Sequence, residues 1–144
     1  MEVRFVDSEL ETVIDRVIKY FTEIDGIQAA YLFGSFATNR VTAESDIDLA
    51  ILTNVALDEE LLFQIQDTLE GLVGREVDLI DLRNCSPILA YQVLKYGKKI
   101  LLRDEHALNL WIIQVLNAYY DLKIDRRPIE RSILERSHSR GASI

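Results

Sequence analysis

Three aspartates and a Gly-Ser pair are the residues of this chain whose types and spacing could do chemistry. Gly34 and Ser35 follow a short apolar run, and Asp46 and Asp48 come shortly after them. Two residues apart on an extended strand, the Asp46 and Asp48 side chains project from the same face, where they repel unless a cation neutralises them. Hard divalent ions take oxygen ligands, and a pair of them can clamp the attacking and leaving oxygens in phosphoryl chemistry. The spacing therefore predicts a site for two magnesium ions.

Two carboxylates bridge a metal pair poorly without a third ligand, and the segment Glu76 to Leu82 (EVDLIDL) offers two candidates. Strand alternation puts Asp78 on one face and Asp81 on the other, and a strand that neighbours Ile47 to Leu52 could bring one of them to the metals. We favour Asp78, because it lies nearer the centre of the strand and Asp81 can serve as a cap or turn residue.

The Gly-Ser pair predicts a cradle for phosphates. Gly34 has no side chain to block a phosphate, Ser35 offers a hydroxyl, and the backbone amides that follow can point at an anion. Arg40, in the same polar loop, could reach a triphosphate, although an exposed loop arginine is more often only solvated. The predicted nucleotide-binding residues are therefore Gly34, Ser35 and Arg40, with Arg40 ranked below the carboxylates.

Hydrophobic periodicity and capping residues predict the elements that position these side chains. Four helices are expected, beginning near Ser8, Asp58, Ser86 and Asp104, and four strands, at Ile27 to Phe33, Ile47 to Leu52, Glu76 to Leu82 and Lys99 to Leu102. The last strand would be a short edge strand whose lysines discourage aggregation. This order predicts a small mixed α/β (α+β) sheet with helices packed mainly on one face and a long C-terminal helix.

The last helix is apolar on more than one side. Leu110, Ile113 and Tyr120 lie off its main stripe, so it has a second surface to bury, and a partner subunit could supply the cover. Beyond it, residues 126–144 carry five arginines against two glutamates and lack a core stripe. We therefore expect one domain over residues 1–125 and a basic polar tail over residues 126–144.

Composition excludes several classes of protein. A net charge of −8 over 144 residues argues against a long nucleic acid substrate, because such binders normally present a basic patch. The first residues do not resemble a signal peptide, and no apolar run is long enough to span a membrane, so a soluble cytoplasmic protein is expected. A single cysteine, Cys85, cannot form an internal disulfide and is assigned no role.

The segment Gly34 to Leu52 (GSFATNRVTAESDIDLAIL) resembles the motif of the DNA polymerase beta nucleotidyltransferase superfamily, in its compact branch of minimal nucleotidyltransferases. VDLIDL, from Val77, is similar to the later strand of that family, which carries the third carboxylate. The resemblance covers Ile27 to about Leu82. One departure is Asn39, where many members have glycine; asparagine is the best substitute at a positive φ angle, so the loop should still close.

The resemblance implies an activity and a partner. Minimal members are typically encoded beside a HEPN-domain ribonuclease toxin and act as its antitoxin. They transfer AMP from ATP, with magnesium, to a toxin hydroxyl, commonly of tyrosine, and release pyrophosphate. Asp46 and Asp48 would hold both metals and Asp78 the catalytic one. Two alternatives are an antitoxin that only binds its toxin and an antibiotic-modifying nucleotidyltransferase, although the latter generally needs a larger second domain than this chain allows.

Overall fold

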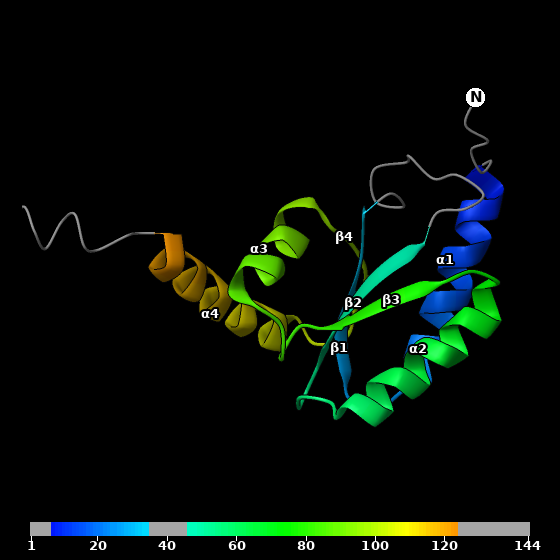
Figure 1. The fold of residues 1–144 in the computed structure, drawn as a ribbon, viewed down its shortest axis with the longest axis horizontal. Coiled ribbons are helices and arrows are strands. Elements are labelled where there is room, and N and C mark those ends of the chain that lie inside the picture. Colours follow the sequence, from blue (N-terminus) through cyan, green and yellow to red (C-terminus); the bar gives the residue numbers. More distant parts are fainter. Residues whose placement is uncertain (1–6, 35–45, 124–144) are drawn as a thin grey trace, which may run out of the picture.

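The computed structural model describes residues 7–34 and 46–123 and shows a twisted sheet flanked by helices (Figure 1). Its eight elements follow the predicted order. They are α1 (Asp7–Thr22), β1 (Ile27–Phe33), β2 (Ile47–Thr53), α2 (Glu59–Val73), β3 (Val77–Asp81), α3 (Pro87–Tyr96), β4 (Lys98–Leu102) and α4 (Glu105–Lys123). The mixed α/β class and the long C-terminal helix are therefore confirmed. The predicted division at residue 125 falls outside the described residues.

The four strands form one mixed sheet in the order β3-β2-β1-β4. β1 is antiparallel to β2 and to β4, whereas β2 is parallel to β3. A parallel pair needs a crossover connection, and α2 provides it. The side chain of Gln66 in α2 also accepts a hydrogen bond from the backbone N–H of Leu79 (3.2 Å), which ties the crossover helix to β3.

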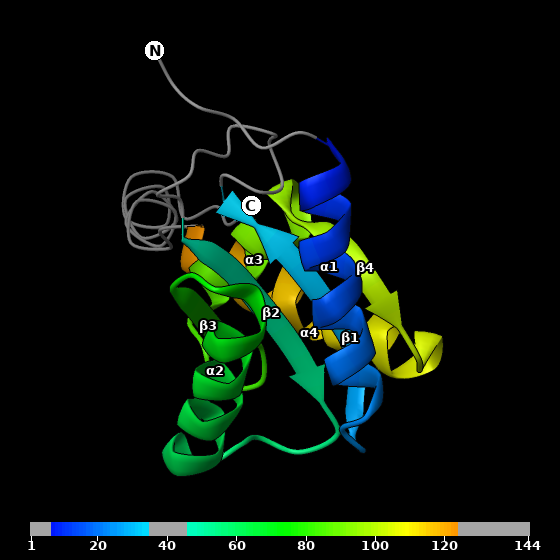
Figure 2. The ribbon, with the colours of Figure 1, turned by 90° about the vertical axis from the view of Figure 1, so that its right-hand side faces the viewer.

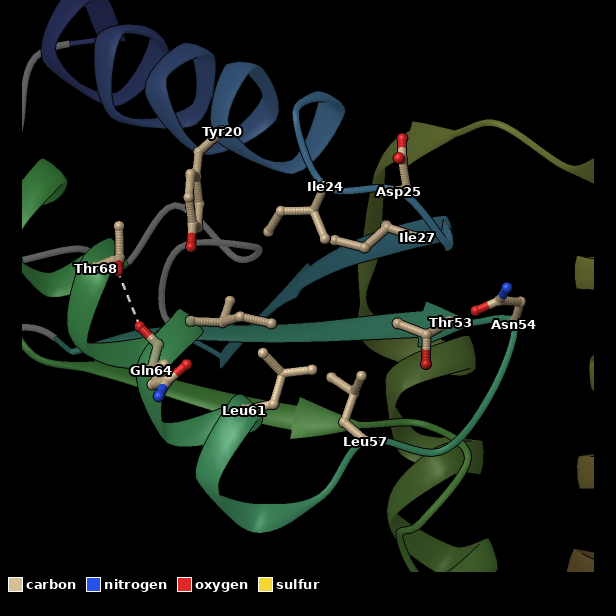
Figure 3. Close-up of a pocket in the computed structure, with 11 residues that line it drawn as sticks. Tyr20, Ile24, Asp25, Ile27, Thr53, Asn54, Leu57, Leu61, Gln64 and Thr68 are labelled. Atoms are coloured by element: carbon tan, nitrogen blue, oxygen red, sulfur yellow. Dashed lines mark hydrogen bonds between the residues drawn. The ribbon is translucent and has the colours of Figure 1, made fainter.

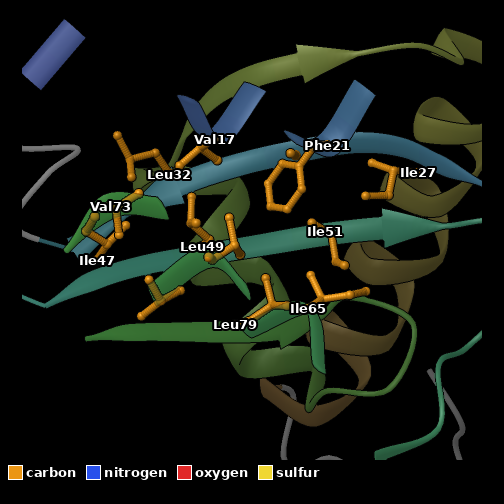
Figure 4. Packing of buried hydrophobic residues seen from close by; sticks show 13 residues of the cluster. Val17, Phe21, Ile27, Leu32, Ile47, Leu49, Ile51, Ile65, Val73 and Leu79 are labelled. Atoms are coloured by element: carbon orange, nitrogen blue, oxygen red, sulfur yellow. The ribbon is translucent and has the colours of Figure 1, made fainter. Parts of the chain in front are cut away.

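Helices cover both faces of the sheet, so the expectation that they pack mainly on one face is wrong. Figure 2 shows α1 and α2 in front of the sheet and α3 and α4 behind it. Val17 and Phe21 of α1 and Ile65 of α2 bury one face (Figure 4), whereas Val93 of α3 and Trp111 of α4 bury the other. The reason is that β1 and β2 are apolar on both sides, which requires cover on both.

Capping residues fix where three of the helices begin, as the sequence predicts. The side chains of Asp58, Ser86 and Asp104 each accept a hydrogen bond from the backbone N–H three residues later, at 2.7, 3.1 and 3.0 Å. Gly74 ends α2 in the left-handed conformation (φ 71°). These local signals set the bounds of α2 and the starts of α3 and α4.

α4 has an apolar surface that the described residues leave uncovered. Trp111 and Val115 are buried against the sheet, whereas the exposed fractions of Leu110, Ile113 and Tyr120 are 50%, 56% and 52%. This is the second surface that the sequence predicts for the helix. No helix within residues 7–34 and 46–123 is long and apolar enough to cross a membrane.

Candidate active site

The three predicted metal ligands lie at one end of the sheet. Asp48, on β2, is opposite Asp78 in the parallel register with β3 and opposite Phe33 in the antiparallel register with β1. Asp46 directly precedes β2. Residues opposite each other on neighbouring strands point to the same face, so the Asp48 and Asp78 side chains are neighbours. Pairing between strands thus brings together carboxylates that are far apart in the sequence.

The surroundings of Asp48 suit a group that a cation neutralises. Asp46 and Asp78 are exposed, whereas Asp48 is half-buried. Burial raises the pKa of Asp48 above its ordinary value, and the negative charges of Asp78 and Asp46 raise that pKa further. Within the described residues, no three acidic, histidine or cysteine side chains are gathered closely enough to hold a metal ion. An ion would therefore have to draw these carboxylates together, and their hard oxygen atoms fit magnesium.

Gly34 is required by two features of this site. Its φ of 71° lies in the left-handed region, which a residue with a side chain adopts only at an energetic cost. A Cβ atom at this position would also lie 3.2 Å from Cγ of Asp48 and closer still to its Oδ2. Gly34 therefore gives room to the Asp48 carboxylate, a role that the sequence did not suggest. Ser35, Asn39, Arg40 and Ser45 lie outside the described residues.

Asp81, the other candidate on β3, has a structural environment. Its side chain is 5% exposed and lies at the other end of the strand, opposite Ile51 of β2. The Oδ2 atom accepts a hydrogen bond from the backbone N–H of Leu57 (2.9 Å), and the Oδ1 atom accepts one from the N–H of Arg83 (3.0 Å). These bonds anchor two loops. The geometry therefore favours Asp78 over Asp81 as the third carboxylate.

Neither described cavity coincides with the three aspartates. A cavity of ≈ 280 Å³ between α1 and α2 is lined by residues that include Tyr20, Thr53 and Asn54, at the end of β2 remote from Asp46 (Figure 3). A groove of ≈ 400 Å³ on the other face is lined by Cys85 and Trp111 among others, and burial raises the pKa of the Cys85 thiol. The aspartates instead lie where β2 and β3 begin and β1 ends.

The chain belongs to the polymerase beta nucleotidyltransferase family. The family model described as "Polymerase beta, Nucleotidyltransferase" matches residues 15–106, which include all three aspartates and more than half of the chain. A shared fold does not by itself identify the acceptor, so the individual relatives carry the finer information.

The curated relatives are named as protein adenylyltransferases, and several of the similar solved structures are named as toxin and antitoxin complexes. The protein adenylyltransferase MntA of Shewanella oneidensis is 30% identical over 116 residues, which are 80% of this chain and 83% of MntA. A crystal structure of a toxin-antitoxin with AMP-PNP has a TM-score of 0.72 and 29% identity, covering 84% of this chain and 98% of that one. The MNT antitoxin in complex with the tri-AMPylated Shewanella oneidensis HEPN toxin has a TM-score of 0.68 and 27% identity, covering 87% and 98%.

Proposed function

We propose that this chain is a protein adenylyltransferase that acts as an antitoxin. It transfers AMP from ATP to a hydroxyl group of a HEPN ribonuclease toxin, with tyrosine as the expected acceptor. The observation that carries the proposal is the register that sets Asp48 opposite Asp78, with Asp46 beside them, in a chain of this family. Support for the acceptor comes from a relative named as a protein adenylyltransferase and from a similar antitoxin in complex with an AMPylated toxin.

The reaction is an in-line displacement at the α-phosphate. The acceptor oxygen forms a bond to phosphorus, the bond to the β-phosphate oxygen breaks, and pyrophosphate leaves. Two magnesium ions, when bound, neutralise the charge that develops on the reacting phosphate and on the leaving group. Asp46 and Asp48 would hold both ions, and Asp78 would hold the catalytic ion and could take the proton of the acceptor hydroxyl. Gly34 keeps the space that the Asp48 carboxylate needs.

The residues that follow Gly34 bind the phosphates in this proposal. The hydroxyl of Ser35 and the neighbouring backbone amides hold the β- and γ-phosphates, where negative charge builds as pyrophosphate leaves. Arg40 adds a positive charge from the same loop. This part of the proposal rests on the sequence pattern and on the similarity to a structure that contains AMP-PNP.

The toxin needs a surface on this chain, and α4 offers one. Leu110, Ile113 and Tyr120 are at least half exposed on one helix, and aromatic and large apolar residues of this kind are typical of the centre of protein interfaces. Covering them with the toxin would bury apolar area that a free monomer leaves in water. Replacing Ile113 with glutamate tests this surface, because toxin binding should weaken while ATP binding is unchanged.

The decisive experiment is intact mass spectrometry of the HEPN partner after incubation with this chain, ATP and magnesium. We expect mass to rise by whole AMP units, and the gain to vanish with Asp46→Asn. Asp67→Asn is the matched control, because Asp67 is an exposed aspartate on α2 and is not one of the three proposed metal ligands. A stable complex without any mass gain would contradict the proposal and indicate an antitoxin that acts by binding alone.

A further inference from the structure

Three lysines lie at the same end of the sheet as the three aspartates, on the opposite edge. β4 begins at Lys98, which is opposite Leu32 of β1, and Lys99 is opposite Tyr31. Lys95 is in the last turn of α3, directly before β4. β1, which lies between β2 and β4, ends at Phe33, directly before Gly34. We call Lys95, Lys98 and Lys99 the lysine edge.

Strand register places Lys98 and Lys99 level with the carboxylates, with Lys98, opposite Leu32, on the face covered by α1 and α2. Asp78, Asp48 and Phe33 are successive partners across β3, β2 and β1, and β4 starts on the far side of β1. At this end of the sheet, β3 and β2 carry negative side chains and β4 carries positive ones. Gly34, which follows β1, lies between the two charged regions. Figure 2 shows the end of β1 and the start of β4 at the end of the sheet where β2 begins.

Lys99 also shares a face with Asp48. Ala50, two residues after Asp48, and Tyr31 are buried together on the face covered by α3 and α4. Alternation along β2 puts Asp48 on that face, and pairing with Tyr31 puts Lys99 there too. Neighbouring strands are about 4.8 Å apart, so β4 lies about 10 Å from β2. A flexible lysine side chain can span much of that separation.

The lysine edge presents its charge at the surface, where the Nζ atom of Lys95 lies 5.2 Å from the centre of the exposed Tyr96 ring. All three lysines are exposed. By contrast, Arg83 donates to the backbone carbonyl of Thr53, and Arg103 donates to those of Phe21 and Ile24. In a chain with a net charge of −8, three lysines within five residues form a local positive patch beside the candidate site. A positive patch attracts anions and can stabilise the negative charge that develops on a leaving group such as pyrophosphate.

We propose that the lysine edge binds the β- and γ-phosphates of ATP and stabilises the departing pyrophosphate, an inference that rests on the proposed function. With the α-phosphate at the aspartates, the rest of the triphosphate passes Gly34 toward β4. The lysine edge then supplies positive charge at the leaving group. A simpler role for lysines on an edge strand is to prevent another strand from pairing with it. Protection of the edge strand does not require the lysines to affect ATP binding, so binding measurements can distinguish the two roles.

The test measures ATP, pyrophosphate and AMP binding to the chain alone by calorimetry, and then KM and kcat for AMP transfer. The variants are Lys98→Gln with Lys99→Gln, and Lys95→Gln. The control is Lys19→Gln, because Lys19 is an exposed lysine in the last turn of α1, near the other end of the sheet. We expect the double variant to weaken ATP and pyrophosphate binding about tenfold or more, the loss typical of hydrogen bonds to charged groups, and to leave AMP binding unchanged.

Two results would overturn the inference while leaving the proposed function intact. In one, the folded double variant binds ATP and pyrophosphate as tightly as the wild type, so that the lysines only protect the edge. In the other, the double variant keeps its ATP affinity but loses the toxin, so that the lysines bind an acidic protein surface. A wild-type chain that binds no ATP in magnesium would overturn the proposed function itself, and this inference with it.

Discussion

The two ends of β3 carry the same residue type in opposite environments. Asp78 is exposed and faces Asp48, whose pKa is raised by burial and by its acidic neighbours. Asp81 is buried, and both of its carboxylate oxygens accept hydrogen bonds from backbone N–H groups. One carboxylate adds to a repulsion that a cation can relieve, and the other satisfies donors that would otherwise be buried unpaired. The neighbouring groups of an aspartate, rather than its residue type, therefore decide whether it takes part in the chemistry of the site or stabilises the fold.

Among these variants, Asp48→Asn should lower the rate of AMP transfer the most, without lowering the stability of the fold. Removing this ligand should lower the rate of AMP transfer by at least about 10²-fold, as loss of one preorganised electrostatic group does elsewhere. Stability should hold or rise, because the repulsion with Asp46 and Asp78 is relieved. Mass spectrometry of the toxin and urea unfolding measure the two quantities. Unchanged transfer would remove Asp48 from the site.

Asp81→Asn should show the reverse pattern. The amide –NH2 group would face a backbone N–H where a carboxylate oxygen now accepts, and a buried donor left unpaired costs about 1–3 kcal/mol of the free energy of unfolding. Transfer activity per folded molecule should be retained, because this carboxylate lies at the other end of the sheet. Urea unfolding and activity at a temperature where the variant is folded check both statements. A stable but inactive variant would reverse the assignment of Asp78 and Asp81.

Gly34→Ala and Gly74→Ala form a matched pair that separates backbone strain from damage to the site. Both glycines have φ 71°, so each substitution should cost about 1–2 kcal/mol of stability. Only at Gly34 does the new Cβ meet Asp48, whereas the space beside Gly74 is open. We therefore expect similar losses of unfolding free energy, with AMP transfer reduced only for Gly34→Ala. Equal activity of the two variants would show that Asp48 can move without consequence.

Magnesium should stabilise the protein through the end of the sheet that carries Asp46, Asp48 and Asp78, and not through the end that carries Asp81. At a magnesium concentration about ten times the dissociation constant, the free energy of unfolding of the wild type should rise by about 1.4 kcal/mol. The gain should be lost in Asp48→Asn, kept in Asp81→Asn, and reversed by a chelator. Thermal unfolding without ATP or toxin measures it, so the result is independent of turnover. The same gain in all three proteins would point to a metal site elsewhere.

Local signals in the sequence predicted each element, because caps and periodicity act within a few residues. Asp58, Ser86 and Asp104 begin their helices as expected, and alternation separated Asp78 from Asp81. Sheet order and register could not be predicted, since they arise from contacts between distant segments. The expectation that helices cover mainly one face of the sheet was wrong. The sequences of β1 and β2 are nearly continuous apolar runs, which are typical of strands buried on both faces.

The candidate site was predicted in its residue types and not in its spatial neighbours. Gly34 was predicted to leave room for phosphates. Only the structure shows that the missing side chain of Gly34 leaves room for the Asp48 carboxylate. The lysines of β4 were given a role against aggregation, because nothing in the sequence shows that β4 pairs with the strand that ends at Gly34. The roles of Ser35 and Arg40 stay predictions.

The crossover through α2 also decides how the site can come apart. Asp78 reaches Asp48 only through the pairing of β3 with β2, and α2 holds β3 through the Gln66 side chain. A local opening of α2 and β3 would separate these carboxylates while the antiparallel β2, β1 and β4 stay paired. Mild heating or denaturant would then silence the enzyme before the chain unfolds. Amide hydrogen exchange at Leu79 would detect this opening, and the rate of AMP transfer would then depend on the local stability of β3.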